Sequence, residues 1–228
     1  MKFQLTLIAL LAVAGLSQAR NFPDFGKGPL HEDIQDILDL VPIDEIKDVF
    51  EEYAKKDDEV KSIIEIAEST SIVKNLVEDF EAIPEAINFF NYLHKKKVYI
   101  YDVMNALNKR LGIKKELVPP SVLVREPYTN PMRTGGLAGL FKDIKVLFNY
   151  DDFIRIYVQK SKTSKPFSKF IDQLKSKNFQ ELVNQVYEIK SFQLILYTLH
   201  DAGVDTRIVS DIMYIVLGIT TPNYPDFF

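Results

Sequence analysis

The tripeptide Leu111-Gly112-Ile113 recurs 106 residues later as Leu217-Gly218-Ile219, and this recurrence decides the fold. At the same offset, apolar residues upstream match in order: Leu76 with Leu182, Val77 with Val183, Ile83 with Ile189, Leu93 with Leu199, Val98 with Val204 and Val103 with Val209. Near residues 69–72 the offset becomes 107, which aligns Asp36, Ile37, Leu40, Asp44 and Ile64 with Asp143, Ile144, Leu147, Asp151 and Ile171. Apolar positions can agree by chance, but the ordered run across the whole unit favours two tandem copies.

The two copies organise the rest of the chain. They span residues 30–113 and 137–219, and residues 114–136 between them contain the Pro and Gly residues typical of a linker. Residues 20–29 form an N-terminal segment and residues 220–228 a C-terminal tail. The copies could fold as separate domains, but about 80 residues in short helices make a marginal core. We therefore expect both copies to close into one globular unit with pseudo-twofold symmetry.

Apolar residues recur at helical spacing throughout both copies. One such stripe consists of Ile72, Val73, Leu76, Val77 and Phe80. Pro84 stands where a helix can begin, and Gly112 stands where one can end. Only Lys97–Tyr101 shows the alternation of a short strand. Each copy has about six helical stripes, which predicts an all-α fold of about twelve short amphipathic helices.

Residues 1–19 are typical of a secretory signal peptide. Lys2 precedes an apolar run over residues 5–14, and Ser17 and Ala19 are the small residues of a cleavage site before Arg20. An uncleaved anchor is the alternative, but the run is shorter than the roughly 20 apolar residues that a spanning helix needs. We therefore expect the mature chain to be secreted.

The composition removes several functional classes. The chain has no Cys, which excludes disulfides, thiolate zinc sites, iron–sulfur clusters and a cysteine nucleophile. With 46% hydrophobic and 26% charged residues, it falls in the globular range rather than the disordered one. Its net charge of −4 argues against a nucleic-acid partner, because nucleic-acid binding relies on a concentrated basic surface.

The sequence contains no complete catalytic motif. His31–Gln35 begins like the helix motif of metalloproteases but lacks the second zinc-binding His. His94 and His200 occupy equivalent repeat positions, and Asp102 or Asp201 could complete a metal or acid–base pair with them. The simpler interpretation is that each His borders a helix C-terminus, where the helix dipole favours an imidazolium. Since nucleophile elbows and phosphate-binding loops are also missing, we expect no enzymatic activity, catalytic residue, metal or cofactor.

Charge is divided unevenly between the copies. Residues 30–113 contain 10 basic and 19 acidic residues, whereas residues 136–219 contain 11 and 9. Six lysines fall close together in the second copy: Lys160, Lys162, Lys165, Lys169, Lys175 and Lys177. A solvated face is the simpler interpretation, and a face that docks on an anionic membrane is the alternative.

Four motifs carry a family resemblance: Asp39–Ile46 (DLVPIDEI), Ala82–Glu85 (AIPE), Phe89–Leu93 (FFNYL) and Leu107–Ile113 (LNKRLGI). They resemble the insect allergen-related repeat family, which includes cockroach group 1 allergens, mosquito midgut microvillar proteins and caterpillar nitrile-specifier proteins. The second copy departs from the first motif, with Phe148-Asn149-Tyr150 in place of Val41-Pro42-Ile43. The resemblance implies a roughly spherical bundle of twelve helices around a large apolar cavity that holds fatty acids or phospholipids. It also implies secretion into the insect gut, with cytolytic activity in some members.

Some expected helices are apolar over more than one stripe, notably around residues 192–199 and 208–217. Such helices are either packed on several sides or line a cavity, and a packed core is the ordinary interpretation because protein interiors are dense. The family resemblance favours the cavity. The candidate lining residues are Phe80, Ile87, Phe90, Leu93, Val103, Leu107, Val186, Leu196, Leu199, Val209 and Met213.

Three functions remain open at this point. The leading expectation is a secreted, non-enzymatic protein of the insect digestive tract that binds fatty acids or phospholipids and acts on membranes. The second is a nitrile-specifier-like detoxification protein that diverts glucosinolate breakdown products. The third is a structural or interaction protein of the gut surface with a dry core.

Overall fold

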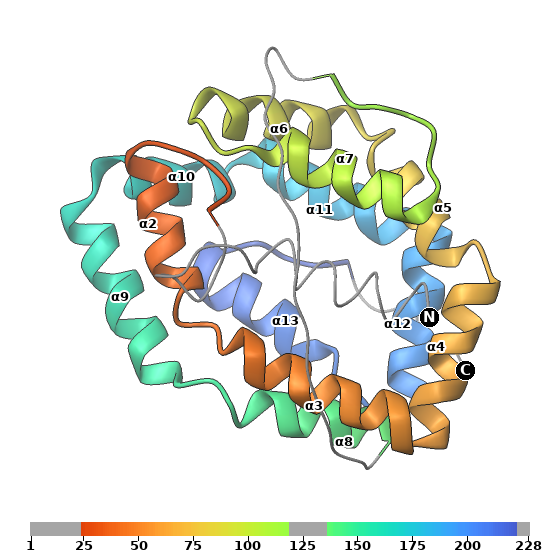
Figure 1. The fold of residues 1–228 in the computed structure, drawn as a ribbon. Helices are drawn as coiled ribbons and strands as arrows, with labels where there is room; N and C mark the ends of the chain where they lie inside the picture. Colours follow the sequence, from red (N-terminus) through yellow and green to blue (C-terminus); the bar gives the residue numbers. More distant parts are fainter. Residues whose placement is uncertain (1–23, 119–135, 223–228) are drawn as a thin grey trace.

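A computed structural model describes residues 24–118 and 136–222, and twelve α-helices follow one another in these residues (Figure 1). The first copy contains α2 (Pro29–Leu38), α3 (Ile43–Lys56), α4 (Asp58–Ser69), α5 (Ile72–Phe80), α6 (Pro84–Lys95) and α7 (Ile100–Leu111). The second contains α8 (Gly136–Lys145), α9 (Tyr150–Thr163), α10 (Lys165–Leu174), α11 (Lys177–Glu188), α12 (Lys190–Asp201) and α13 (Arg207–Ile212). A π-helical turn, η1 (Met213–Leu217), continues α13. The prediction of an all-α fold is confirmed.

The Lys97–Tyr101 segment does not form an extended strand. Val98 makes one isolated antiparallel bridge with Gly26, and α7 begins at Ile100. The bridge carries two backbone hydrogen bonds, from Lys27 N to Lys97 O (2.8 Å) and from Tyr99 N to Phe25 O (2.7 Å). These two hydrogen bonds therefore tie the start of the described chain to the loop between α6 and α7.

Local sequence signals set the helix ends in both copies. The Asp57 side chain accepts hydrogen bonds from two backbone N–H groups at the start of α4, and Ser164 caps α10 at the equivalent position. Pro84 occupies the first turn of α6, where its missing N–H costs no helical hydrogen bond. Gly112 and Gly218 end α7 and η1 with left-handed φ values of 66° and 68°, which favour glycine.

Contacts between the copies come in pairs that pseudo-twofold symmetry relates. The α3 helix packs on α8 as α2 packs on α9, and α4 packs on α8 as α2 packs on α10. Similarly, α5 packs on α12 as α6 packs on α11. Exchanging the copies converts each contact into its partner, so the two sets of helices form one bundle.

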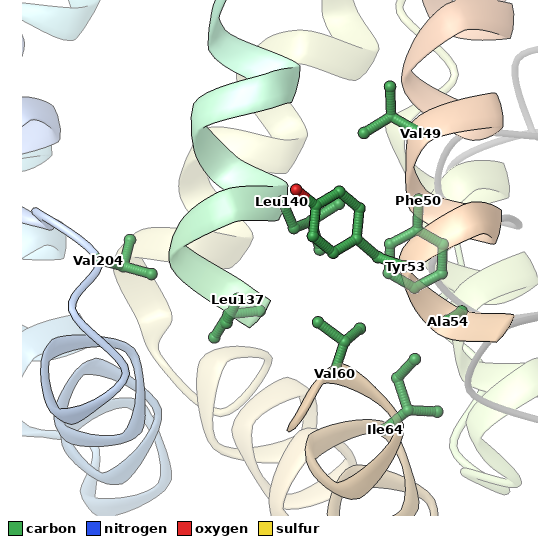
Figure 2. Close-up of a cluster of buried hydrophobic side chains, with 9 residues drawn as sticks. All are labelled: Val49, Phe50, Tyr53, Ala54, Val60, Ile64, Leu137, Leu140 and Val204. Carbon is green, nitrogen blue, oxygen red and sulfur yellow. The ribbon is translucent and has the colours of Figure 1, made fainter. Parts of the chain in front are cut away.

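The first core cluster joins the copies through α3, α4 and α8 (Figure 2). It consists of Val49, Phe50, Tyr53, Ala54, Val60, Ile64, Leu137, Leu140 and Val204. The Tyr53 hydroxyl donates a hydrogen bond to Asp143 Oδ2 on α8 (3.0 Å). Gly139 permits this approach, because a Cβ there would lie 2.8 Å from the Tyr53 hydroxyl oxygen.

A polar contact between α9 and α2 is the pseudo-twofold counterpart of the Tyr53–Asp143 hydrogen bond. Lys160 is equivalent to Tyr53, and Asp36 is equivalent to Asp143, at the offset of 107. Lys160 Nζ bonds Asp36 and also lies 3.0 Å from Asp33 Oδ1. The same two repeat positions therefore join the copies on both sides of the bundle.

Two further core clusters lie within the described residues. The second cluster fills the first copy between α5, α6 and α7: Val77, Phe90, Tyr101, Met104, Ile113 and Leu117. The third joins α6 to α11 and the start of α12: Ile83, Ala86, Leu182 and Ile189. No helix in residues 24–118 or 136–222 is long and apolar enough to cross a membrane.

Candidate functional site

The candidate lining residues of the first copy are mostly packed against one another. Phe80, Ile87, Phe90 and Leu107 all belong to the second cluster or pack on it. The Phe90 ring meets the rings of Phe80 and Tyr101 edge to face, at 5.9 and 6.0 Å between centroids. Leu93 is buried and Val103 is half-buried. On this side of the bundle, the apolar faces fill space with protein side chains.

The candidate residues of the second copy have different surroundings. Val186 packs on the third cluster, and Leu199 packs on the first. Leu196 and Met213 are half-buried, whereas Val209 is 58% exposed. The structure does not bring these five residues into one cluster.

Three elements of the second copy expose apolar side chains instead of burying them. No residue of α9, α13 or η1 is buried. The exposed apolar residues of these elements are Tyr150, Ile154, Val158, Ile208, Val209, Ile212, Tyr214 and Ile215, and Ile215 reaches 79% exposure. We call this set the uncovered apolar residues.

The difference in burial is clearest between α3 and α9, which both have 14 residues and occupy equivalent positions in the two copies. The α3 helix buries Ile43, Val49 and Phe50 against its neighbours. On α9, Tyr150, Ile154 and Val158 follow at intervals of four residues, so they form one exposed stripe on the helix. None of these three residues is among the predicted site residues, although apolar residues at intervals of four in the sequence indicate such a stripe.

The six lysines of the second copy do not share one environment. Lys160 is half-buried, and it forms ion pairs with Asp33 and Asp36. Burial lowers its pKa, but hydrogen bonds to Asp36 and Asp33 outweigh this and raise the pKa above the ordinary value. The five exposed lysines follow from the end of α9 to the start of α11: Lys162, Lys165, Lys169, Lys175 and Lys177.

The His residues form no metal site in the part of the chain that is described. His94 and His200 lie in the last turns of α6 and α12, where their backbone carbonyls accept hydrogen bonds from Lys97 and Gly203. His31 is 1% exposed, with Nε2 2.8 Å from Asp24 Oδ1 and its ring edge-on to Phe25. Residues 24–118 and 136–222 contain no group of three or more His, Asp or Glu placed to hold a metal ion.

A buried polar cluster at the end of α7 was also missed at the sequence level. The Glu81 side chain is fully buried and accepts a hydrogen bond from Asn108 Nδ2 (2.7 Å), while Lys115 Nζ lies 3.5 Å from its other oxygen. Asn105 exchanges two hydrogen bonds with the backbone of Leu117 (2.6 and 2.7 Å). These contacts hold the chain that leaves α7 against the bundle, so their role is structural.

Comparison with known proteins gives two matches. A family model described as insect allergen related repeat, nitrile-specifier detoxification, matches residues 29–209. Protein G12 of Anopheles gambiae is 22% identical over 185 residues, which cover 81% of this chain and 85% of that protein. The family match runs from the start of the first copy through the segment between the copies and into α13 of the second.

Proposed function

The chain belongs to the insect allergen-related repeat family, and from this premise we propose that it is a secreted, non-enzymatic lipid-binding protein of the insect digestive tract. In this proposal the acyl chains of fatty acids or phospholipids cover the uncovered apolar residues of the second copy. In this way the ligand would supply the apolar contacts that neighbouring helices do not make with these residues.

The observation that carries the proposal is the burial difference between the copies. The equivalent helices of the first copy, α3 and α7, each bury apolar side chains, while α9, α13 and η1 bury none of their residues. Apolar surface left in contact with water gives up about 25 cal/mol per Å2 that burial would provide. A lipid that covers this surface recovers that free energy.

The chemistry of the uncovered residues also sets the expected specificity. They are aliphatic or aromatic, and Tyr150 and Tyr214 alone among them carry a polar group. A wall of this kind stabilises a lipid through its acyl chains and places few constraints on its head group. We therefore propose that the protein accepts several lipids that differ in their head groups.

Native mass spectrometry of protein purified from a lipid-rich expression host tests this proposal. We expect adducts with fatty acid or phospholipid masses, which disappear after solvent extraction. Extraction should also lower the melting temperature, since a ligand that binds only the folded state stabilises it by mass action. Protein that carries no lipid and keeps its melting temperature after extraction would support a dry core and a structural role.

A second candidate function follows from the family description, which names nitrile-specifier detoxification. Analysis of products formed from a glucosinolate and myrosinase, with and without the protein, tests it directly. Nitriles that appear only in the presence of the protein would favour this function over lipid carriage. An unchanged product ratio would leave the lipid-binding proposal as the better account.

A further inference from the structure

The copies differ most at their last helices. In the first copy, α7 packs on both α5 and α6. The symmetric contacts in the second copy would place α13 on α11 and α12, but within the described residues α13 packs less closely on both of them than α7 packs on α5 and α6. Residues 207–217 are therefore held less firmly than the equivalent part of α7.

Two substitutions between the copies explain this difference. In α7, Tyr101 and Met104 are 5% and 9% exposed and anchor the helix in the second cluster. Arg207 and Ser210 stand at the equivalent positions of α13. Tyr101 also donates a hydrogen bond to Asn91 Oδ1 on α6 (3.0 Å), whereas Arg207 Nε donates to Asp205 Oδ1 just before its own helix (3.3 Å).

The apolar positions that surround these anchors in the first copy are also apolar in the second. Val183, Leu196 and Ile219 stand where the second cluster has Val77, Phe90 and Ile113. Val183 and Ile219 are buried. These positions therefore keep their apolar character, whereas α13 lacks the two side chains that anchor α7.

Both ends of this segment are fixed. On the N-terminal side, Val204 is buried in the first cluster. On the C-terminal side, Ile219 is 2% exposed, and Thr220 exchanges backbone hydrogen bonds with the Gln180 side chain of α11 (2.6 and 2.9 Å). Gly218, with φ at 68°, lies between η1 and this second anchor. A loosely packed helix between two fixed points can move about its ends without unfolding the bundle.

We propose that α13 and η1 form a lid, which swings about residues 205–206 and Gly218 and opens the route by which an acyl chain enters. The role in entry rests on the lipid-binding function proposed above, whereas the motion itself does not. Opening removes no buried side chain from the core, because α13 and η1 bury none. The π-helical turn at the end of the lid fits this role, since such turns are frequent at functional positions in helices.

Amide hydrogen exchange of the purified protein tests the motion. We expect the amides of residues 207–217 to exchange at least tenfold faster than those of the equivalent residues 101–111, because α7 is anchored and α13 is not. The two segments have matched positions in one molecule, so each measurement contains its own control. Equal protection of the two segments would overturn the lid.

The double variant R207Y/S210M tests the role in entry. It restores the anchors of α7, so we expect slower exchange in residues 207–217 and an uptake rate for a fluorescent long-chain fatty acid at least fivefold lower. Final occupancy should stay close to that of the wild type. The control K109Y/S69M introduces the same side chains at exposed positions of the first copy and should leave uptake unchanged.

The possible outcomes separate the two proposals. Slower exchange with an unchanged uptake rate would overturn the lid as the entry route. If R207Y/S210M does not fold, the exchange comparison in the wild type still decides whether the lid moves. A wild-type protein that does not take up the fatty acid at all would refute the lipid-binding function, and with it the entry role, even if residues 207–217 exchange quickly.

Discussion

At the scale of single residues, one pair of repeat positions joins the copies twice with different chemistry. Tyr53 bonds Asp143 across one side of the bundle, and Lys160 bonds Asp36 across the other. Burial and the hydrogen bond to Asp143 raise the pKa of Tyr53 to about 12. Both bonds use the protonated form of the donor, so alkaline pH weakens both of them.

The first prediction concerns this pH dependence. The pKa of Tyr53 is raised on folding, so its contribution is fully present below pH 10 and is lost as pH rises through about 12. Urea unfolding between pH 8 and pH 12 should show the free energy of unfolding decline above pH 10, and decline less in Y53F. The same slope for Y53F and the wild type would contradict this assignment.

A second prediction separates Lys160 from the exposed lysines. K160M leaves Asp33 and Asp36 without their cation and should lower the free energy of unfolding by about 2 kcal/mol. This is less than the roughly 3–5 kcal/mol cost of breaking a fully buried pair, because the Asp36 side chain is half-exposed. K160Y should cost less, because a tyrosine serves the equivalent position in the first copy. The control K162M changes an exposed lysine and should stay within about 0.5 kcal/mol of the wild type. Equal effects of K160M and K162M would show that the ion pairs contribute little.

At the scale of helices, periodicity predicted much of the fold but not the partners of each helix. The stripe from Ile72 to Phe80 and the signals at Pro84 and Gly112 mark real helices and helix ends. Lys160 shows the limit, because it was grouped with the other lysines although its partners Asp33 and Asp36 lie more than 120 residues away. Contacts at that separation follow from the arrangement of helices, which local spacing does not encode.

The candidate site could be predicted from the sequence less fully than the fold. An apolar stripe looks the same whether a neighbouring helix or a ligand covers it, so Phe90 and Val209 were grouped together although one is packed and the other exposed. Comparing the copies position by position is more informative. Arg207 in place of Tyr101, and Ser210 in place of Met104, mark the helix that lost its anchors.

A third prediction concerns the five exposed lysines, which follow from the end of α9 through α10 to the start of α11. The double variant K165E/K169E should weaken binding to vesicles rich in anionic lipid, because each basic residue near such a surface contributes about 1 kcal/mol. The difference from the wild type should shrink at high salt, because salt screens the attraction. K109E/R110E makes the same charge change at the end of α7 and serves as the control. Vesicle binding that depends neither on the anionic lipid content nor on the salt concentration would exclude docking through this face.

At the scale of the whole molecule, two copies of a marginal unit close into one bundle without a disulfide. The packing of α3 on α8 and of α2 on α9, together with the third cluster, supplies the cohesion that cystine bridges give many small secreted proteins. The first copy supplies a packed core, and the second supplies the apolar surface that we assign to the ligand. A reducing agent should therefore leave the melting temperature unchanged, whereas removal of lipid should lower it.

The central claim is that acyl chains cover the uncovered apolar residues of the second copy. The chain has no Trp, so a single introduced Trp reports on one place. We predict that a brominated fatty acid quenches the fluorescence of V209W on α13 in a saturable manner, and that it leaves K177W, at an exposed basic position, nearly unquenched. Equal quenching of the two variants, or none in V209W at saturating fatty acid, would contradict the claim.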